Sequence, residues 1–237
     1  MEAAREHTRF NNVKYDAAWA IRFRPEPEAA RTRPGAHHVR YAARHLIIDE
    51  GDAARAVYEV LDGGVILFKL LPDGRRQIIE LLGVGDVFGL AVGPVADVAA
   101  EALTPVRLAV FEPSAVDADP ALRDRLFARL RAQMCALHDH ALLLGRKSAQ
   151  ERVATYLMRL VPGRGGLACI GAAPGNPEVR IELRMSRQEI ADYLGLTIET
   201  VSRTFSAMRR ASLISYRKQE EVVVPNLCRL CRLTGAH

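Results

Sequence analysis

The chain has 237 residues, enough for one large domain or two small ones, and 49% of them are hydrophobic, so a buried core can form. No apolar run reaches the roughly 18 residues of a membrane span, and the charged start is unlike a signal peptide. The four scattered cysteines do not suggest a disulfide scaffold. We therefore expect a cytoplasmic protein without a membrane partner. Residues 145–237 hold 15 Lys and Arg against 8 Asp and Glu, a net charge of +7 that leaves −2 for the first 144 residues, so attraction to phosphate is expected at the C-terminal end.

The first half of the chain predicts an N-terminal extension followed by a β-roll. Residues 1–40 are rich in Pro and Gly breakers, so we expect extended or mobile chain there. From 41 to 118, short apolar strands alternate with turn signals such as Asp73-Gly74, which is typical of a sandwich or roll. No catalytic set, phosphate loop or metal-ligand spacing is present, so we predict neither an enzyme nor a metal site. The expected strands are residues 46–48, 56–61, 65–71, 77–82, 87–90 and 106–111.

A helical period replaces the strand pattern after the roll and predicts one long helix over 119–146. Its apolar residues step by three and four, close to the spacing of a coiled-coil seam. Such a stripe could pack on the roll, but we favour a dimer seam, because proteins that read DNA with one helix usually work in two-fold pairs. The predicted seam consists of Leu126, Leu130, Met134, Leu137, Ala141 and Leu144.

The C-terminal part, residues 147–237, predicts a winged helix-turn-helix. Its centre is residues 186–214, where Ser186 and Glu189 form a capping box that starts one helix. Gly195 permits the positive φ that ends this helix, and Thr197 is a good N-cap for a second one. Residues 213–216 and 222–224 then flank a charged tip and indicate a β-hairpin, the wing. The same pattern without DNA binding would be an ordinary helical hairpin and a solvated turn.

The outer face of the second helix carries Glu199, Ser202 and Arg203, close to its N-terminal end. Arg can bond bidentately to guanine, Glu can accept from cytosine N4, and Ser can serve several bases, so these three are the expected base-reading residues. Phosphate contacts are expected from polar and basic side chains around them and on the wing. This second set is Ser186, Arg187, Thr197, Thr200, Arg217 and Lys218.

Together these motifs resemble the Crp–Fnr family of bacterial transcription regulators, in particular its FixK-like members. The specific motifs are LPDGRRQ (71–77) and GDVFGL (85–90) in the roll, LGRKSA (144–149) at the junction, and MSRQEIADYLGLTIETVSR (185–203). The resemblance implies an α+β fold with an N-terminal cyclic-nucleotide-binding-like roll, a dimerisation helix and a winged helix-turn-helix. It also implies a homodimeric activator that binds promoter DNA and recruits RNA polymerase. By position, Glu199, Ser202 and Arg203 match the family residues that read a TTGA-type half-site in an inverted repeat.

Departures from the family pattern argue against the two best-known signals. Family members that bind cyclic AMP hold its phosphate with Gly-Glu-Leu and an Arg, but the matching region here has no Arg and places Asp97 and Glu101 there instead. No cysteine precedes Cys135, so an N-terminal iron–sulfur site cannot be assembled. FixK-like relatives often act without a co-effector, and we expect no cofactor here. The alternative is a ligand- or haem-gated regulator with a small molecule in the roll, for which His45, His138 or His140 would matter.

The remaining cysteines have weaker functional interpretations. Cys228 and Cys231 form a C-x-x-C pair, but no second pair completes a metal site, so we expect two small residues on a terminal helical turn. Cys169 lies in a Gly-rich segment before the helix-turn-helix and is a candidate for oxidation that would disturb DNA contact.

Overall fold

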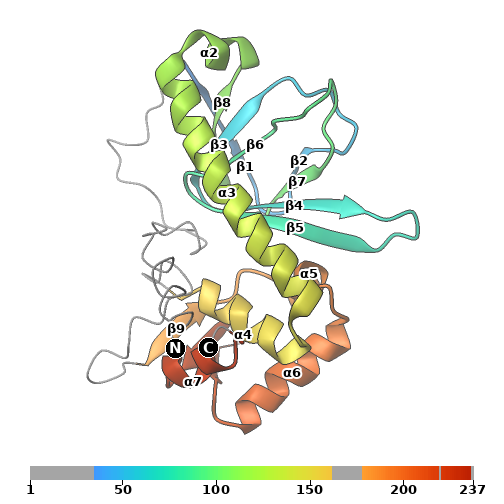
Figure 1. Cartoon of the computed structure of the whole chain (residues 1–237), viewed down its shortest axis with the longest axis vertical. Coiled ribbons are helices and arrows are strands. Elements are labelled where there is room, and N and C mark those ends of the chain that lie inside the picture. Colours follow the sequence, from blue (N-terminus) through green and yellow to red (C-terminus); the bar gives the residue numbers. More distant parts are fainter. Residues whose placement is uncertain (1–34, 162–177, 219, 236–237) are drawn as a thin grey trace, which may run out of the picture.

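The computed structural model describes residues 35–161, 178–218 and 220–235, and it has the α+β architecture predicted from the sequence. Figure 1 shows the roll at one end, a long helix running down its side, and a helical C-terminal domain at the other end. The N-terminal extension up to residue 34 and Cys169 lie outside the described residues. In the part that is described, no helix is long and apolar enough to cross a membrane.

The roll consists of two four-stranded antiparallel sheets, with strand orders β1-β8-β3-β6 and β2-β7-β4-β5. The tip of the β4–β5 hairpin contains Gly74 at φ 83°, as its Asp-Gly turn predicts. Apolar side chains from both sheets form the core of the roll. The strands are β1 (His37–Tyr41), β2 (Leu46–Ile48), β3 (Val57–Asp62), β4 (Val65–Leu70), β5 (Arg76–Leu82), β6 (Val87–Phe88), β7 (Ala99–Ala102) and β8 (Val106–Phe111).

Two of these strands differ from the sequence expectations. β1 starts at His37, inside the segment assigned to the N-terminal extension, and pairs along its whole length with β8. It was missed because its residues are mostly polar and exposed, so only backbone pairing defines it. β7 lies between β2 and β4, and its sequence AAEA has neither an alternating pattern nor residues that favour strands.

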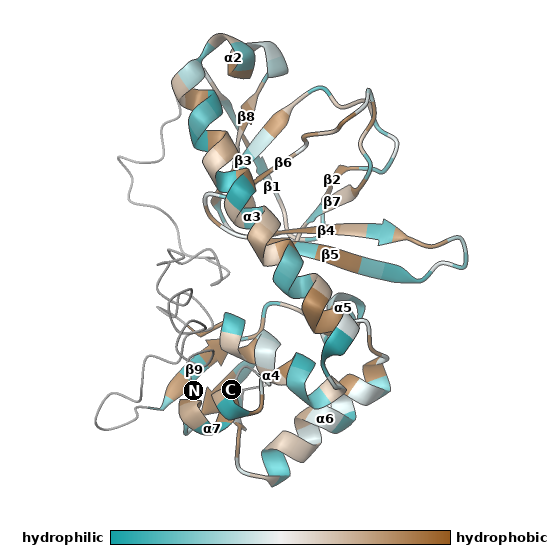
Figure 2. Cartoon of the chain, in the orientation of Figure 1, coloured by the Kyte–Doolittle hydropathy of each residue, from teal (hydrophilic) through white to brown (hydrophobic). Residues whose placement is uncertain are grey.

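Two helices follow the roll: α2 (Pro113–Ala118) and the long α3 (Pro120–Arg146). Asp119 begins α3, because its Oδ1 accepts hydrogen bonds from the backbone N–H groups of Ala121 and Leu122. Figure 2 shows hydrophobic and hydrophilic residues alternating along α3. Its N-terminal half packs Leu122 and Leu126 against the β1-β8-β3-β6 sheet, and Leu143 near its end lies in the core shared with the C-terminal domain.

The C-terminal domain is a winged helix-turn-helix with a three-stranded sheet, order β10-β11-β9. Its core also includes apolar residues of β4 and β5, so the roll and the C-terminal domain share one hydrophobic cluster. Its elements are α4 (Ala149–Arg159), β9 (Val179–Glu182), α5 (Arg187–Leu194), α6 (Ile198–Arg210), β10 (Ser215–Lys218), β11 (Glu221–Val224) and α7 (Leu227–Arg232).

Candidate DNA-binding interface

The turn between α5 and α6 has the geometry that its sequence predicts. Both parts of the capping box form: the Ser186 hydroxyl accepts from the Glu189 N–H, and the Glu189 carboxylate accepts from the Ser186 N–H. Gly195 ends α5 at φ 59°, where only glycine is free of strain. The Thr197 hydroxyl then accepts from the backbone N–H of Thr200 and starts α6.

The three expected base-reading side chains share the outer face of α6. Val201, Phe205 and Met208 are buried on the inner face, as the helical spacing predicts. Glu199, Ser202 and Arg203 are exposed. Figure 1 shows α6 at the end of the molecule opposite α2, so the roll does not cover this helix.

Glu199 is held in its ionised form by its surroundings. Its pKa is lowered first by a hydrogen bond from its own backbone N–H, then by the Thr197 side chain, with a smaller contribution from the charge of Arg203. An ionised carboxylate only accepts hydrogen bonds, which suits the amino group of cytosine. Glu199 and Arg203, one turn apart, therefore offer an acceptor and a donor fork on one face of the helix.

The expected phosphate-contacting residues differ in how accessible they are. Ser186 and Thr197 are exposed, whereas Thr200 is half-buried. The hydroxyl oxygens of Thr197 and Thr200 lie 3.1 Å apart and share a hydrogen bond. Arg187 is also half-buried: its guanidinium stacks over the Phe205 ring at 3.7 Å and donates to the Tyr216 hydroxyl at 2.8 Å. The structure therefore places Arg187 in a contact that joins α5, α6 and β10.

The wing and the end of α6 supply further positive charge. Arg217 is exposed on β10; Lys218 follows it in the same strand, and its side chain lies outside the described part. Arg209 and Arg210 are exposed in the last turn of α6 and were missed by the sequence analysis, because basic residues there are also expected simply to complement the helix dipole.

Ile198 is a third residue that the sequence analysis missed. It is the first residue of α6 and leaves 37% of its surface exposed beside Glu199. An apolar side chain at the start of a helix that meets base edges can contact the methyl group of thymine. The sequence contained no clear signal for it, because Ile198 lies three residues before Val201 and so continues the helical spacing of the inward-facing Val201, Phe205 and Met208.

Arg152 holds the helix-turn-helix against the end of α3. Its guanidinium donates to the carbonyl oxygens of Leu144 at 2.7 Å and Leu194 at 2.8 Å, and its Nε donates to the Lys147 carbonyl at 2.9 Å. These carbonyls belong to the last turns of α3 and α5 and to the residue joining α3 to α4, and such carbonyls lack partners within their own helices. One side chain in α4 therefore fixes the relative position of α3 and α5.

The predicted dimer seam is only partly free on α3. Leu126 packs on the roll and Leu144 on the C-terminal core, while Leu130 and Leu137 are half-buried. Met134 and Ala141 are exposed, and Phe127, seven residues before Met134, is 60% exposed. The solvent-facing apolar stripe of α3 thus runs through Phe127, Met134 and Ala141.

The histidines of the ligand-gated alternative lie in different environments. His45 stacks on Tyr41, His138 is exposed on α3, and His140 is buried with its ring stacked on Tyr193 at 4.3 Å. Burial, with the charges of Arg159 and Arg152, lowers the pKa of His140 to about 4. Among the described residues, no group of three or more His, Cys, Asp or Glu side chains could hold a metal ion.

The other sequence candidates were placed as follows. Glu101 lies on β7 and forms ion pairs with Arg44 at 3.7 Å and Arg76 at 3.5 Å. Cys228 is half-buried and Cys231 buried on α7, the terminal helical turn that the sequence predicts.

Comparisons with known proteins agree with this geometry. Residues 38–118 match the cyclic nucleotide-binding domain family and residues 151–233 the Crp-like helix-turn-helix domain family. The chain is 37% identical over 195 residues to the transcriptional activatory protein AadR of Rhodopseudomonas palustris, covering 81% of this chain and 76% of that protein. It is also 37% identical over 199 residues to the nitrogen fixation regulation protein FixK of Bradyrhizobium diazoefficiens, covering 79% of each. The solved structure of FixK2 from Bradyrhizobium japonicum matches with a TM-score of 0.70 and 36% identity, over 84% of this chain and 96% of that one.

Proposed function

Because the chain belongs to the Crp–Fnr family of transcription regulators, we propose that it activates transcription as a homodimer that binds an inverted repeat of TTGA-type half-sites. The observation that carries the proposal is the outer face of α6, where Glu199, Ser202 and Arg203 are exposed together. Promoter DNA and RNA polymerase are the partners that this function requires.

The bases are assigned by matching donors to acceptors. Arg203 bonds the guanine of the half-site, Glu199 accepts from the opposite cytosine, and Ser202 lies near thymine. Ile198, exposed at the start of α6, contacts a thymine methyl group. Ser186, Thr197, Arg217 and the two arginines at the end of α6 contribute phosphate contacts, which position the protein without selecting sequence.

Dimerisation through α3 supplies the second recognition helix. The stripe of Phe127, Met134 and Ala141 repeats every seven residues, which is the spacing of a two-helix seam. Two half-sites in an inverted repeat then lie about one helical turn, roughly 34 Å, apart. The half-buried Leu130 and Leu137 complete the seam at its edge.

We propose further that DNA binding needs neither a cyclic nucleotide nor an iron–sulfur cluster. The region that matches the phosphate site of cyclic-AMP-binding relatives contains Asp97 and Glu101, and negative charge there opposes a phosphate. Glu101 is already paired with Arg44 and Arg76, so these two arginines are engaged as well.

Substitution of Arg203 tests the base assignment. In Arg203→Ala we expect affinity for a TTGA-type inverted repeat to fall by about 1–3 kcal/mol, with relaxed selectivity at the G·C pair, because the bidentate contact to guanine is lost. Fluorescence anisotropy on this duplex and on one with changed G·C pairs measures both effects. Arg217→Ala is the control, expected to weaken binding to specific and scrambled DNA alike. Equal losses on the two duplexes in Arg203→Ala would contradict the assignment.

A further inference from the structure

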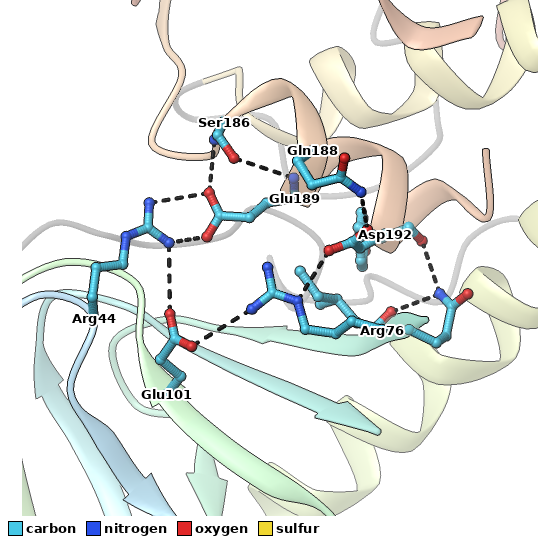
Figure 3. A network of polar contacts seen from close by, with 10 residues as sticks. Arg44, Arg76, Glu101, Ser186, Gln188, Glu189 and Asp192 are labelled. Carbon is cyan, nitrogen blue, oxygen red and sulfur yellow. Dashed lines mark hydrogen bonds and ion pairs between the residues drawn. The ribbon is translucent and has the colours of Figure 1, made fainter. Parts of the chain in front are cut away.

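A chain of alternating charges connects the roll to α5 (Figure 3). The Arg44 guanidinium makes two contacts with the Glu189 carboxylate, one of them 3.0 Å long, and lies 3.7 Å from Glu101. Glu101 also lies 3.5 Å from Arg76, whose Nε donates to Asp192 at 3.0 Å. We call these five residues the interdomain network; three belong to the roll and two to the first helix of the helix-turn-helix.

The carboxylates of the network are largely withdrawn from water. The side chain of Glu189 is 5% exposed, that of Asp192 10% and that of Glu101 17%. A carboxylate in such a place needs a charged partner, and removing that partner leaves a buried charge without compensation. While α5 stays against the roll, loss of any one of these partners therefore leaves a poorly hydrated carboxylate unpaired, so this arrangement depends on the network as a whole.

Glu189 has two roles at the start of α5. One carboxylate oxygen accepts from the Ser186 N–H at 2.8 Å, which is half of the capping box. The same carboxylate receives the Arg44 guanidinium from the roll. The group that begins the helix is thus also the group that fixes it to the other domain.

The backbone of Arg44 is consistent with a functional reason for an arginine at this position. Its φ is 69°, a left-handed conformation that is unfavourable for any residue with a Cβ. Glycine or asparagine would be favoured by the turn alone. The backbone N–H of Arg44 donates to the Ala102 carbonyl at 2.7 Å, one residue from Glu101, so the turn is held beside β7. This strained position is where the Arg44 side chain reaches both Glu101 and Glu189.

From this geometry we propose that Arg44, Glu101 and Arg76 are positioning residues for DNA recognition. They hold α5, and through the Gly195 turn also α6, at a fixed place relative to the roll and to α3. The outer face of α6 stays exposed in this arrangement, so the network maintains the DNA-reading position instead of blocking it. The inference rests on the proposed function, since it is the paired reading of two half-sites that requires this fixed placement.

The network should therefore affect the pairing of half-sites more than the reading of either one. A loosened α5 leaves the base contacts of each α6 unchanged but lets the two recognition helices depart from the spacing of the inverted repeat. Affinity for a duplex with both half-sites should fall by about fivefold or more, which is within the usual range of coupling between sites. Affinity for a duplex with one half-site scrambled should change by less than about twofold.

The chain offers a closely matched pair of variants for the test. Glu189→Gln keeps the capping box, in which glutamine also serves, but removes the charge that pairs with Arg44. Glu151→Gln makes the same change in the capping box of α4, formed by Ser148 and Glu151, and within the described residues no ion pair joins Glu151 to the roll. We expect only Glu189→Gln to lose affinity for the double half-site, and only in that variant should amide hydrogen exchange in residues 186–195 of the DNA-free protein become faster.

A charge-conserving substitution separates positioning from general stability. Arg76→Met should weaken binding to the double half-site, because Glu101 and Asp192 then lose their shared positive partner, whereas Arg76→Lys keeps that charge and should retain much of the affinity. Two results would overturn the proposal: equal behaviour of Glu189→Gln and Glu151→Gln in both measurements, or equal losses in Arg76→Met and Arg76→Lys. If the parent protein does not distinguish TTGA-type from scrambled DNA, the proposed function fails. Amide hydrogen exchange in the DNA-free protein then decides whether the network holds α5.

Discussion

His140 is a titratable residue buried at the junction of the two domains. Its side chain stacks on Tyr193, and neither ring nitrogen has a hydrogen-bond partner among the described residues. Burial lowers its pKa to about 4, and the charges of Arg159 and Arg152 act in the same direction. Between pH 6.5 and 4 the unfolded chain therefore binds a proton that the folded protein does not, so the free energy of unfolding falls as the pH is lowered through this window.

Replacing this side chain should remove that acid sensitivity. Between pH 7.5 and 5 we expect the free energy of unfolding of His140→Phe to fall by about 2 kcal/mol less than that of the parent, since phenylalanine keeps the stacking but cannot bind a proton. Urea unfolding at fixed protein concentration measures this difference. His138→Gln, at an exposed neighbouring position, should keep the parental pH dependence. An unchanged slope in His140→Phe would show that the histidine is not neutral in the folded state.

Single residues were predictable where their role is local. The capping box of α5, the left-handed Gly195 and the Thr197 cap follow from short sequence spacings, because each depends only on residues within three or four positions. Arg187 and Arg44 were not predictable in this way. Their partners are 18 to 145 positions away, so the local sequence does not show whether either arginine faces a phosphate, a carboxylate or an aromatic ring.

The long helix α3 presents three faces to three different environments. Its N-terminal half covers the roll, its last turn enters the C-terminal core, and a third face is left to solvent. The apolar stripe predicted from the sequence combines residues from all three of these faces, and the residues at its two ends, Leu126 and Leu144, pack within the protomer. The exposed portion centres on Met134, which has 52% of its surface accessible.

A charge in the centre of this stripe should prevent dimerisation. We expect Met134→Glu to shift the protein to a monomer at micromolar concentration, because two carboxylates would meet across a two-fold seam. The monomer should keep its folded circular-dichroism spectrum and lose affinity for the double half-site. Ala128→Glu, on another exposed face of α3, should stay dimeric in sedimentation velocity. A dimeric Met134→Glu would place the interface elsewhere.

Elements with a strong apolar period were the ones that sequence analysis could predict. α3, α6 and the wing follow from repeated spacing, and the strands from β3 to β5 follow from apolar runs between turns. β1 and β7 have no such signal. β1 is mostly polar and lies at the edge of its sheet, whereas β7 consists mostly of alanine and is buried between its neighbours. Only tertiary pairing, with β8 and with β2 and β4, defines these two strands.

For the whole molecule, the position of the C-terminal domain is the feature that sequence could not supply. Motifs predicted the roll, the helix and the winged domain separately, but not that β4 and β5 share a core with α5. The interdomain network lies beside this shared core and spans residues from 44 to 192 (Figure 3). The orientation of the recognition helix therefore depends on contacts that no local pattern reveals.

Equilibrium binding of the purified DNA-free protein to three duplexes tests the central claim most directly. The first carries a TTGA-type inverted repeat with half-sites one helical turn apart, the second has five extra base pairs between them, and the third is scrambled. Without added cyclic AMP, we predict nanomolar affinity for the first, binding to the third at least about 1,000-fold weaker, and a marked loss on the second, whose half-sites face opposite sides of the duplex. Equal affinity for all three, or a requirement for cyclic AMP, would contradict the account.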